Sequence, residues 1–343
     1  MRKLGRTEHH RGLVGVDIGT TSVKMVELSG SPGSFTLENI SVVAVPDEAS
    51  EAAYERAVTL MLEGKELASN HAATSVSGRK VAVRGMRFPA LAEAELDGAL
   101  RYEGSQVIAF DLNDSYLDHC VIDSAKDDAK MMDVLFVAAR RELVDSKVSV
   151  LEQVGLEPRV VGVDALVLLD ALLMEDDLPE TCGVISIGAA NTSIGIEREG
   201  TVPFVRDIEI GGSAYTTAIA DALGVSTEDA EKVKLMEPER ELASTRAIER
   251  VTQHLVGEIS RSLMYYQTRG NGTQVDALYL CGGASGVPGL SDAISVAAGI
   301  PVHIWSPLDC VEVDDARFDS AAVKRLSSVS SLAAALAMKQ DPN

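Results

Sequence analysis

The sequence predicts an α/β protein in which two related α/β domains face each other across a cleft, with a small α+β subdomain inserted into the first. The main observation is an internal duplication: an apolar strand, a glycine-containing turn and a second strand begin near Val14 and again near Gly183. Strand and helix patterns alternate after each opening, as in α/β domains. A length of 343 residues suits about two domains, and a cleft between domains is a common ligand site.

The first half opens as a β-meander, because turns and no helix separate its first strands. We expect its strands at residues 13–18, 22–28, 35–45, 81–83 and 160–163, and its helices at 51–68 and 165–174. The inserted piece carries a helix at 92–108, strands at 116–122 and 133–138, and a helix at 141–154. Gly155 and Pro158 follow this last helix and are a good stop signal.

The second half repeats the opening meander and continues with helices. Its strands are expected at 183–187, 192–198, 202–210, 275–280 and 302–304, and its helices at 212–223, 227–236, 242–268, 290–298 and 328–338. We therefore divide the chain into a first domain (1–85 with 160–182 and 327–343), an inserted subdomain (86–159) and a second domain (183–326).

The composition describes a protein with an aliphatic core and a strong negative charge. Hydrophobic residues make up 46% of the chain and aromatic residues only 4%. The net charge of −21 argues against a nucleic-acid partner, because phosphate backbones are bound by basic surfaces. No apolar run reaches about 18 residues, so we expect no transmembrane helix. The four cysteines form no CxxC pair and are expected to be buried free thiols of a reducing compartment.

Two tight turns carry the candidate chemistry. The first runs from Gly19 through Thr20 and Thr21 to Ser22, and the second begins at Gly188. Backbone N–H groups in such a turn can form a nest for an anion such as phosphate. No helix follows the first turn directly, which excludes a Walker or Rossmann loop. One turn alone fits an ordinary hairpin, but two in register favour a phosphate site.

Other residues near these turns could complete the site. Asp17 ends the strand before the first turn and is expected to hold a hydrated Mg²⁺ through water, and Lys24 has the reach to add positive charge. The loop that begins at Gly282 either lies against a nucleoside or is an ordinary βα turn. Glu231 and Lys234 share a helix face, so they either contact a ribose or form a solvated ion pair.

These features resemble the actin-like ATPase superfamily, which includes actin, the Hsp70 chaperones and sugar kinases. Residues 14–24 look like its first phosphate motif, 184–192 like its second, and 280–289 like its adenosine motif. Within the superfamily the chain is most similar to the PilM family, the FtsA-like proteins of type IV pilus assembly. The segments that carry this closer match are VDIGTTSVKMVEL at 16–28, ALRYE at 99–103, VAARRELV at 137–144, VRDIEIGG at 205–212, and Ala230, Glu231 and Lys234.

The resemblance implies an actin-like ATPase fold that binds ATP and Mg²⁺ between its two halves. The implied nucleotide contacts are Asp17, Gly19, Thr20, Thr21, Ser22, Lys24, Ser186, Gly188, Ala189, Asn191, Thr192, Gly211, Gly212, Glu231, Lys234, Gly282, Gly283 and Ala284. The second phosphate motif of the superfamily usually has Asp where this chain has Ser186. We therefore expect ATP to bind and hydrolysis to be slow or absent, because phosphoryl transfer depends on positioning and charge stabilisation.

The resemblance also implies partners. Proteins of the PilM family bind the short cytoplasmic tail of the membrane protein PilN, beside the inserted subdomain. The chain is therefore expected to be cytoplasmic and to reach the inner membrane only through such a partner, with other pilus assembly proteins and a second copy of itself as further candidates.

Three rival functions remain to be weighed. The enzyme alternative is a small-molecule kinase of carbohydrate type, with Asp164 or Asp207 nominated as its base. A chaperone would need a substrate-binding domain after the ATPase core, for which no length remains. A cell-division protein of the FtsA type would need a basic amphipathic helix at its end, and residues 337–343 do not form one.

Overall fold

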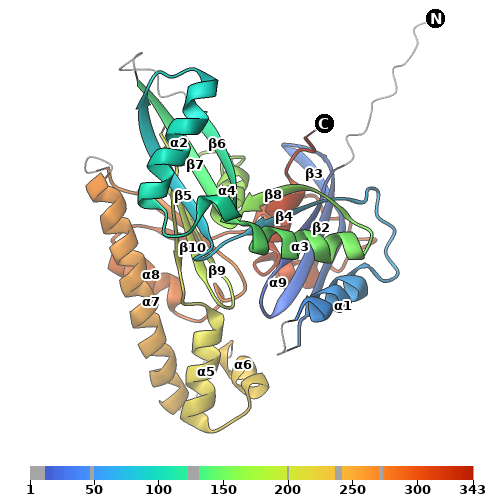
Figure 1. Cartoon of the computed structure of the whole chain (residues 1–343). Coiled ribbons are helices and arrows are strands. Elements are labelled where there is room, and N and C mark those ends of the chain that lie inside the picture. The colour runs from blue at the N-terminus through green and yellow to red at the C-terminus, as the bar shows by residue number, and fades with distance from the viewer. Residues whose placement is uncertain are drawn as a thin grey trace, which may run out of the picture.

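The computed structural model describes residues 12–46, 50–122, 131–198, 201–235, 242–269 and 273–342. Within these residues the strands form two five-stranded sheets and one three-stranded sheet (Figure 1). The predicted first domain begins with residues 1–11, and the predicted helix 227–236 ends at Met236; these positions lie outside the described residues.

The first sheet has the strand order β3-β2-β1-β4-β8. Its strands are β1 (Val14–Ile18), β2 (Ser22–Ser31), β3 (Ser34–Ala44), β4 (His71–Val76) and β8 (Glu157–Val163). The first three strands are antiparallel neighbours, whereas β4 and β8 run parallel to β1. Helices α1 (Glu51–Leu62) and α3 (Arg141–Gln153) cover one face, where Val58 and Leu151 pack with Val16 in one core.

The second sheet repeats this topology in the order β11-β10-β9-β12-β13. Its strands are β9 (Thr181–Ile187), β10 (Thr192–Arg198), β11 (Phe204–Ile208), β12 (Ala277–Cys281) and β13 (Val302–Ile304). Again three antiparallel strands are followed by two strands parallel to the first of them. The duplication read from the sequence is therefore a duplication of the fold.

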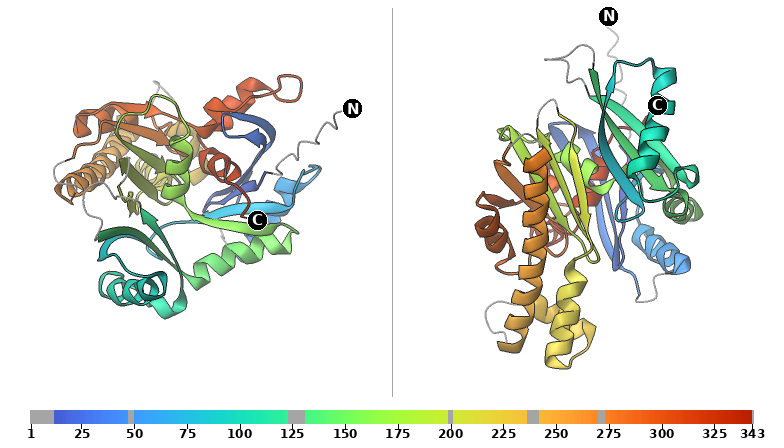
Figure 2. Two further views of the ribbon diagram at one scale, coloured as in Figure 1. Left: turned by 90° about the horizontal axis from the view of Figure 1, so that it is seen from above. Right: turned by 60° about the vertical axis from the view of Figure 1, so that its left-hand side comes forward.

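Helices fill the space between and outside the two large sheets. Helices α4 (Asp164–Leu172) and α10 (Ser331–Ala337) lie between the sheets, in a core that joins Leu28 of the first sheet to Val184 of the second. Outside the second sheet pack α5 (Gly212–Leu223), α6 (Thr227–Lys234), α7 (Leu242–Arg269) and α8 (Leu290–Ala298). The long α7 runs along the outer side of this half (Figure 2).

The third sheet, with the order β5-β7-β6, shares no strand with the other two and forms a unit of its own beside them (Figures 1 and 2). It consists of β5 (Val81–Pro89), β6 (Ser115–Ile122) and β7 (Met131–Arg140), and α2 (Glu93–Val107) packs on it through Leu96 and Leu100. Its other face contacts both halves, because Val83 and Leu135 pack with Val163 and Val202. This unit combines helix and strands, as predicted for the small α+β insertion.

Several predicted element boundaries are wrong. The helix predicted at 51–68 ends at Leu62, because Glu63 leaves the helical conformation with a ψ of 126° and Gly64 follows with a left-handed φ of 70°. Strand β4 was not predicted, since His71–Val76 is made of small side chains without a clear alternation. The strand predicted at 81–83 continues to Pro89, which is tolerated because β5 is an edge strand. Helix α9 (Ser320–Ser327) was also missed.

The packing of α3 bears on the division into domains. We predicted that the insertion runs from 86 to 159, yet Val150 and Leu151 of α3 are buried in the core of the first sheet. The third sheet also begins at Val81. We therefore propose a narrower insertion, from Val81 to Arg140, with α3 assigned to the first domain.

Candidate functional site

A cleft of about 1040 Å³ lies between the two halves and is lined by residues from both. Pockets of this size hold small-molecule ligands and cofactors. Of the residues implied by the resemblance, the cleft brings together Asp17, Gly19, Thr20, Thr21, Ser22, Lys24, Ser186, Gly188, Ala189, Asn191, Gly212, Glu231, Lys234, Gly282, Gly283 and Ala284. Thr192 and Gly211 are not among the lining residues.

The first turn joins β1 to β2 and is closed by a hydrogen bond from the Gly19 N–H to the Ser22 carbonyl, 3.1 Å. Asp17 and Lys24 are partners in the register of the two strands, and their side chains form an ion pair of 3.0 Å. Lys24 Nζ also donates to the Ser22 carbonyl at 3.3 Å. A carboxylate and an ammonium group therefore stand together at the mouth of this turn.

The second turn joins β9 to β10 and is held from outside by the start of α5. The N–H groups of Gly212 and Ser213 donate to the carbonyls of Gly188 and Ala189, at 2.8 and 2.9 Å. Gly211 lies behind the turn, where an added Cβ would come within 2.5 Å of the Ala189 carbonyl oxygen. Gly211 therefore does not line the cleft. Its lack of a side chain allows the start of α5 to pack closely against the backbone of the second turn.

Thr192 and Ser186 lie on the strands that flank the second turn. Thr192 is fully buried, and its hydroxyl donates to the Ile210 carbonyl at 2.7 Å, which explains its absence from the cleft surface. Ser186 does line the cleft, and its hydroxyl also reaches the buried thiol of Cys281. Burial raises the pKa of Cys281 to about 12, so this thiol stays neutral and adds no charge to the site.

The loop after β12 packs its backbone onto the second turn. Gly282 has a φ of 92°, and an added Cβ would come within 2.6 Å of the Ile187 carbonyl oxygen. The Ala284 N–H donates to that same carbonyl at 3.0 Å. Only glycine combines this left-handed conformation with this contact, so the Gly282–Gly283 pair is more specific than an ordinary βα turn.

Glu231 and Lys234 form an ion pair at the edge of the cleft. Lys234 Nζ lies 2.5 and 2.6 Å from the two carboxylate oxygens of Glu231, and the Thr216 hydroxyl donates to Glu231 at 2.5 Å. Only 5% of the Lys234 side chain is exposed, against 52% of Glu231. The pair is therefore partly enclosed rather than fully solvated, and it lines the cleft with both side chains.

The cleft also contains residues that the sequence reading did not assign to nucleotide binding. Lys147 and Ser146 of α3 line it, as do Asp164, Ser77 and Tyr54. Asp164 follows β8, and desolvation by burial raises its pKa. No local motif marks these positions, because Ser77 and Asp164 follow β4 and β8 whereas the others lie on α1 and α3, and only the tertiary fold brings them to one cleft.

Asp207, the second acid nominated for a kinase, has a structural place instead. One of its carboxylate oxygens accepts a hydrogen bond from the Ser193 hydroxyl at 2.6 Å, and the other accepts from the Gly78 N–H at 2.6 Å. Arg79 forms an ion pair with Glu209 alongside. These contacts tie β11 of the second half to the turn between β4 and β5, and Asp207 is not a lining residue of the cleft.

Asp17 is the carboxylate that we expect to hold a metal ion, and Asp164 and Glu231 also line the cleft. The described residues contain no group of three or more His, Cys, Asp or Glu side chains that could hold a metal ion. Asp17 alone fits the way Mg²⁺ is bound beside a nucleotide, since this ion keeps several waters and needs only one or two carboxylates with the phosphates.

The fold is similar to those of several solved structures. The PilM–PilN type IV pilus biogenesis complex is similar, with 25% identity, coverage of 97% of this chain and 100% of that chain, and a TM-score of 0.86. The ethanolamine utilization protein EutJ from Carboxydothermus hydrogenoformans has 16% identity, coverage of 98% and 91%, and a TM-score of 0.53. MreB 5 of Spiroplasma citri bound to AMPPNP has 11% identity, coverage of 96% and 95%, and a TM-score of 0.50. The predicted actin-like fold is confirmed.

Among the described residues, none of the helices combines the length and the hydrophobicity that a membrane-spanning helix needs.

The model of one family, described as type IV pilus assembly protein PilM, matches residues 15–341. This match spans both halves, the cleft and the inserted unit. The chain belongs to the PilM family of type IV pilus assembly proteins.

Proposed function

We propose that this actin-like component of type IV pilus assembly binds ATP with Mg²⁺ in its cleft and works as a nucleotide-dependent adaptor rather than as a fast enzyme. The observation that carries the proposal is the cleft itself, which is lined by two topologically equivalent turns, one from each half. The carbohydrate-kinase alternative is not favoured, because the family match and the similar PilM–PilN structure point to pilus assembly. Of its two nominated bases, Asp207 has both oxygens occupied, whereas Asp164 lines the cleft.

The two turns would hold the phosphates from opposite sides. Hydroxyls of Thr20, Thr21 and Ser22 and the backbone N–H groups of both turns are the donors, and Lys24 supplies positive charge. These local donors matter because the net charge of −21 opposes the approach of an anion. Asp17 would hold Mg²⁺ through water, and the ion would neutralise phosphate charge.

The nucleoside would lie toward the second half. Gly212, Gly282 and Gly283 offer flat backbone surfaces there, and the Glu231–Lys234 pair offers a carboxylate that is half exposed to the cleft. A carboxylate in this place can accept hydrogen bonds from ribose hydroxyls.

Slow hydrolysis would follow from Ser186. A hydroxyl at this position can hydrogen-bond to a water but supplies no negative charge to orient an attacking one. Purified chain with Mg²⁺ and ATP should release phosphate far more slowly than the ~1–100 per second of kinases. Turnover in that range would refute this part of the proposal.

The partner proposed for the chain is the cytoplasmic tail of a PilN-like inner-membrane protein, and the support for a PilN partner is the similarity to a PilM–PilN type IV pilus biogenesis complex. Such a tail would bring the chain to the cytoplasmic side of the inner membrane, and other pilus assembly proteins or a second copy could join it there. The test is a titration of the full chain with the tail peptide, set against a panel of sugars with ATP. Peptide binding without sugar-dependent ADP release supports the adaptor, and the reverse supports a kinase.

A further inference from the structure

Lys147 lines the cleft and forms no ion pair with any carboxylate among the described residues. Its Nζ donates to the Ser75 carbonyl at 2.6 Å. The other lysines that line the cleft each form an ion pair: Lys24 with Asp17 at 3.0 Å, Lys234 with Glu231 at 2.5 Å, and Lys232 with Glu228 and Asp229 at 3.1 Å. No described carboxylate lies within ion-pair distance of Lys147.

A buried carboxyl group stands near this ammonium group. Oxygen Oδ1 of Asp164 is buried and has no hydrogen-bond partner among the described residues, while the hydroxyls of Ser75 and Ser77 interact with the carboxyl group. Lys147, Asp17 and Asp164 all line the cleft, and the charges of Lys147 and Asp17 both act on Asp164. A buried oxygen without a hydrogen-bond partner costs free energy unless another group occupies the site.

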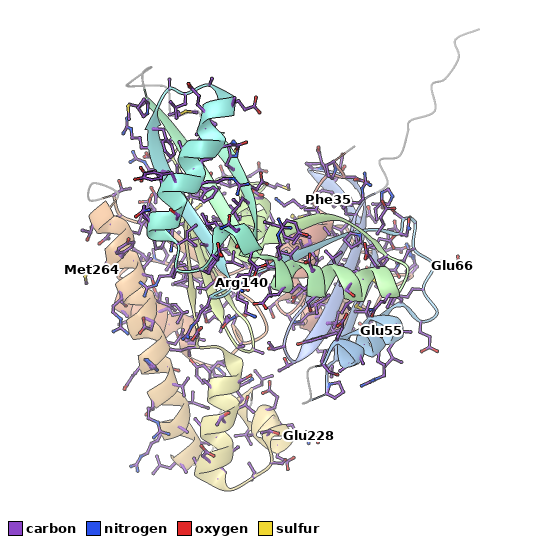
Figure 3. The ribbon with its side chains drawn as sticks, viewed as in Figure 1. Phe35, Glu55, Glu66, Arg140, Glu228 and Met264 are labelled. Atoms are coloured by element: carbon purple, nitrogen blue, oxygen red, sulfur yellow. The ribbon has the colours of Figure 1, made fainter. Side chains whose placement is uncertain are left out.

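Lys147 is also mechanically connected to the inserted unit. Helix α3 begins at Arg141, immediately after β7 ends at Arg140, with no loop between them. Figure 3 shows Arg140 at this junction, between the third sheet and the helix that leads toward α1. The Arg140 N–H donates to the Lys80 carbonyl at 2.9 Å, so hydrogen bonds of the backbone hold this junction. A rotation of the third sheet would therefore move the whole helix.

We propose that Lys147 binds the terminal phosphate of the nucleoside triphosphate in the cleft, so that the orientation of the inserted sheet depends on whether that phosphate is present. This rests on the proposed function, which places a nucleotide in the cleft but assigns Lys147 no part. An ammonium group has three donors, so Lys147 can keep the Ser75 carbonyl while it donates to a phosphate oxygen. Its charge would offset that of Asp17 and Asp164 beside the incoming anion.

The experiment measures the affinities of the full chain for ATP and ADP, with Mg²⁺, by calorimetric titration of four proteins: the unchanged chain, Lys147→Met, Lys147→Arg and Lys80→Met. Loss of a charge-assisted hydrogen bond should weaken ATP binding of Lys147→Met by ~10- to 100-fold. Its ADP affinity should stay within about threefold of the unchanged chain, because ADP lacks the phosphate concerned. Lys147→Arg keeps the charge and should retain most of the preference for ATP.

Lys80→Met is the matched control. It removes a lysine bonded to the same helix, but Lys80 is about half exposed and lies outside the cleft, so both affinities should be unchanged. Equal loss of ATP and ADP affinity in Lys147→Met, or no loss, would overturn the inference while leaving ATP binding intact. If the unchanged chain binds neither nucleotide, the proposed function fails and the inference fails with it.

Hydrogen exchange supplies the second readout and separates a phosphate contact from damage to the fold. In the unchanged chain, the backbone amides of β7 and α3 should exchange at different rates with ATP and with ADP. In Lys147→Met this difference should vanish while the exchange of β9 and β10 in the nucleotide-free protein stays unchanged. An ATP-dependent difference in β7 that persists in Lys147→Met would contradict the connection through α3.

Discussion

Gly211 lies so close to the second turn that a single added methyl group should disrupt it. An alanine Cβ at this position would stand 2.5 Å from the Ala189 carbonyl oxygen and 2.6 Å from that of Gly188, whereas ordinary contact begins near 3.4 Å. These are backbone atoms that cannot rotate away, so the turn and the start of α5 must separate by most of an ångström. The φ of −145° suits any residue, so the effect is steric alone.

The expected cost follows from what that separation breaks. Two hydrogen bonds, of 2.8 and 2.9 Å, cross from the start of α5 to the turn, and each contributes about 0.5–1.5 kcal/mol. With the strain of overpacking, Gly211→Ala should lower the free energy of unfolding by about 2–4 kcal/mol. ATP affinity should fall as well, because the displaced turn is one wall of the cleft.

Urea unfolding followed by circular dichroism measures this change. The matched control is Gly98→Ala in the exposed face of α2, where an added Cβ meets nothing within 4 Å. That variant should be more stable than the unchanged chain by about 0.5–1 kcal/mol, because alanine favours a helix over glycine. The same unfolding midpoint for Gly211→Ala and the unchanged chain would refute the steric argument.

Three further predictions concern single groups. The prediction that the cysteines are buried is wrong for Cys120 and Cys310, which are exposed. Burial raises the pKa of Cys182 to about 11 and that of Cys281 to about 12, so at pH 7 a thiol reagent should modify the exposed Cys120 before these two; equal rates would contradict this. Burial also raises the pKa of Asp164 above its ordinary 3.8, so its ionisation opposes folding as pH rises, and Asp164→Asn should raise the melting temperature at pH 7. That gain should disappear below pH 3.8, where both states are protonated, and a gain that persists there would refute the reasoning. Asp207→Ala should lose about 2–4 kcal/mol of unfolding free energy with its two hydrogen bonds, while Asp221→Ala on exposed α5 should stay within about 0.5 kcal/mol.

The duplicated strand–turn–strand pattern was readable from sequence because its signals are local. Apolar runs around Val14 and Gly183 and the glycines between strands predicted both sheets' openings, and β10, α5, α8 and β13 lie at the predicted residues. The end of α1 was missed because the polar residues after Leu62 fit a helix, whereas the backbone leaves the helix at Glu63 and turns through the left-handed Gly64.

The candidate site was less readable where it depends on distant segments meeting. The sequence around Lys147 is typical of a charged residue on the solvent-exposed face of a helix. Nothing near it in the sequence indicates that this residue of α3 lines the cleft. Thr192 shows the opposite error. It belongs to a motif that contacts ligands in the superfamily, yet its strand places the hydroxyl on a backbone carbonyl inside the protein. Whether the side chain of a strand residue faces the cleft or the core depends on the register of that strand, which the motif does not specify.

The most direct test of nucleotide binding in the cleft is the ATP affinity of the full chain, with and without Mg²⁺, compared with that of Asp17→Ala. Asp97→Ala, in the exposed surface of α2, is the control for loss of one negative charge. We predict that ATP binds, that removal of Mg²⁺ weakens binding, and that Asp17→Ala loses ~10-fold or more and no longer responds to Mg²⁺. Equal affinities for the unchanged chain and Asp17→Ala, with and without the ion, would contradict the account.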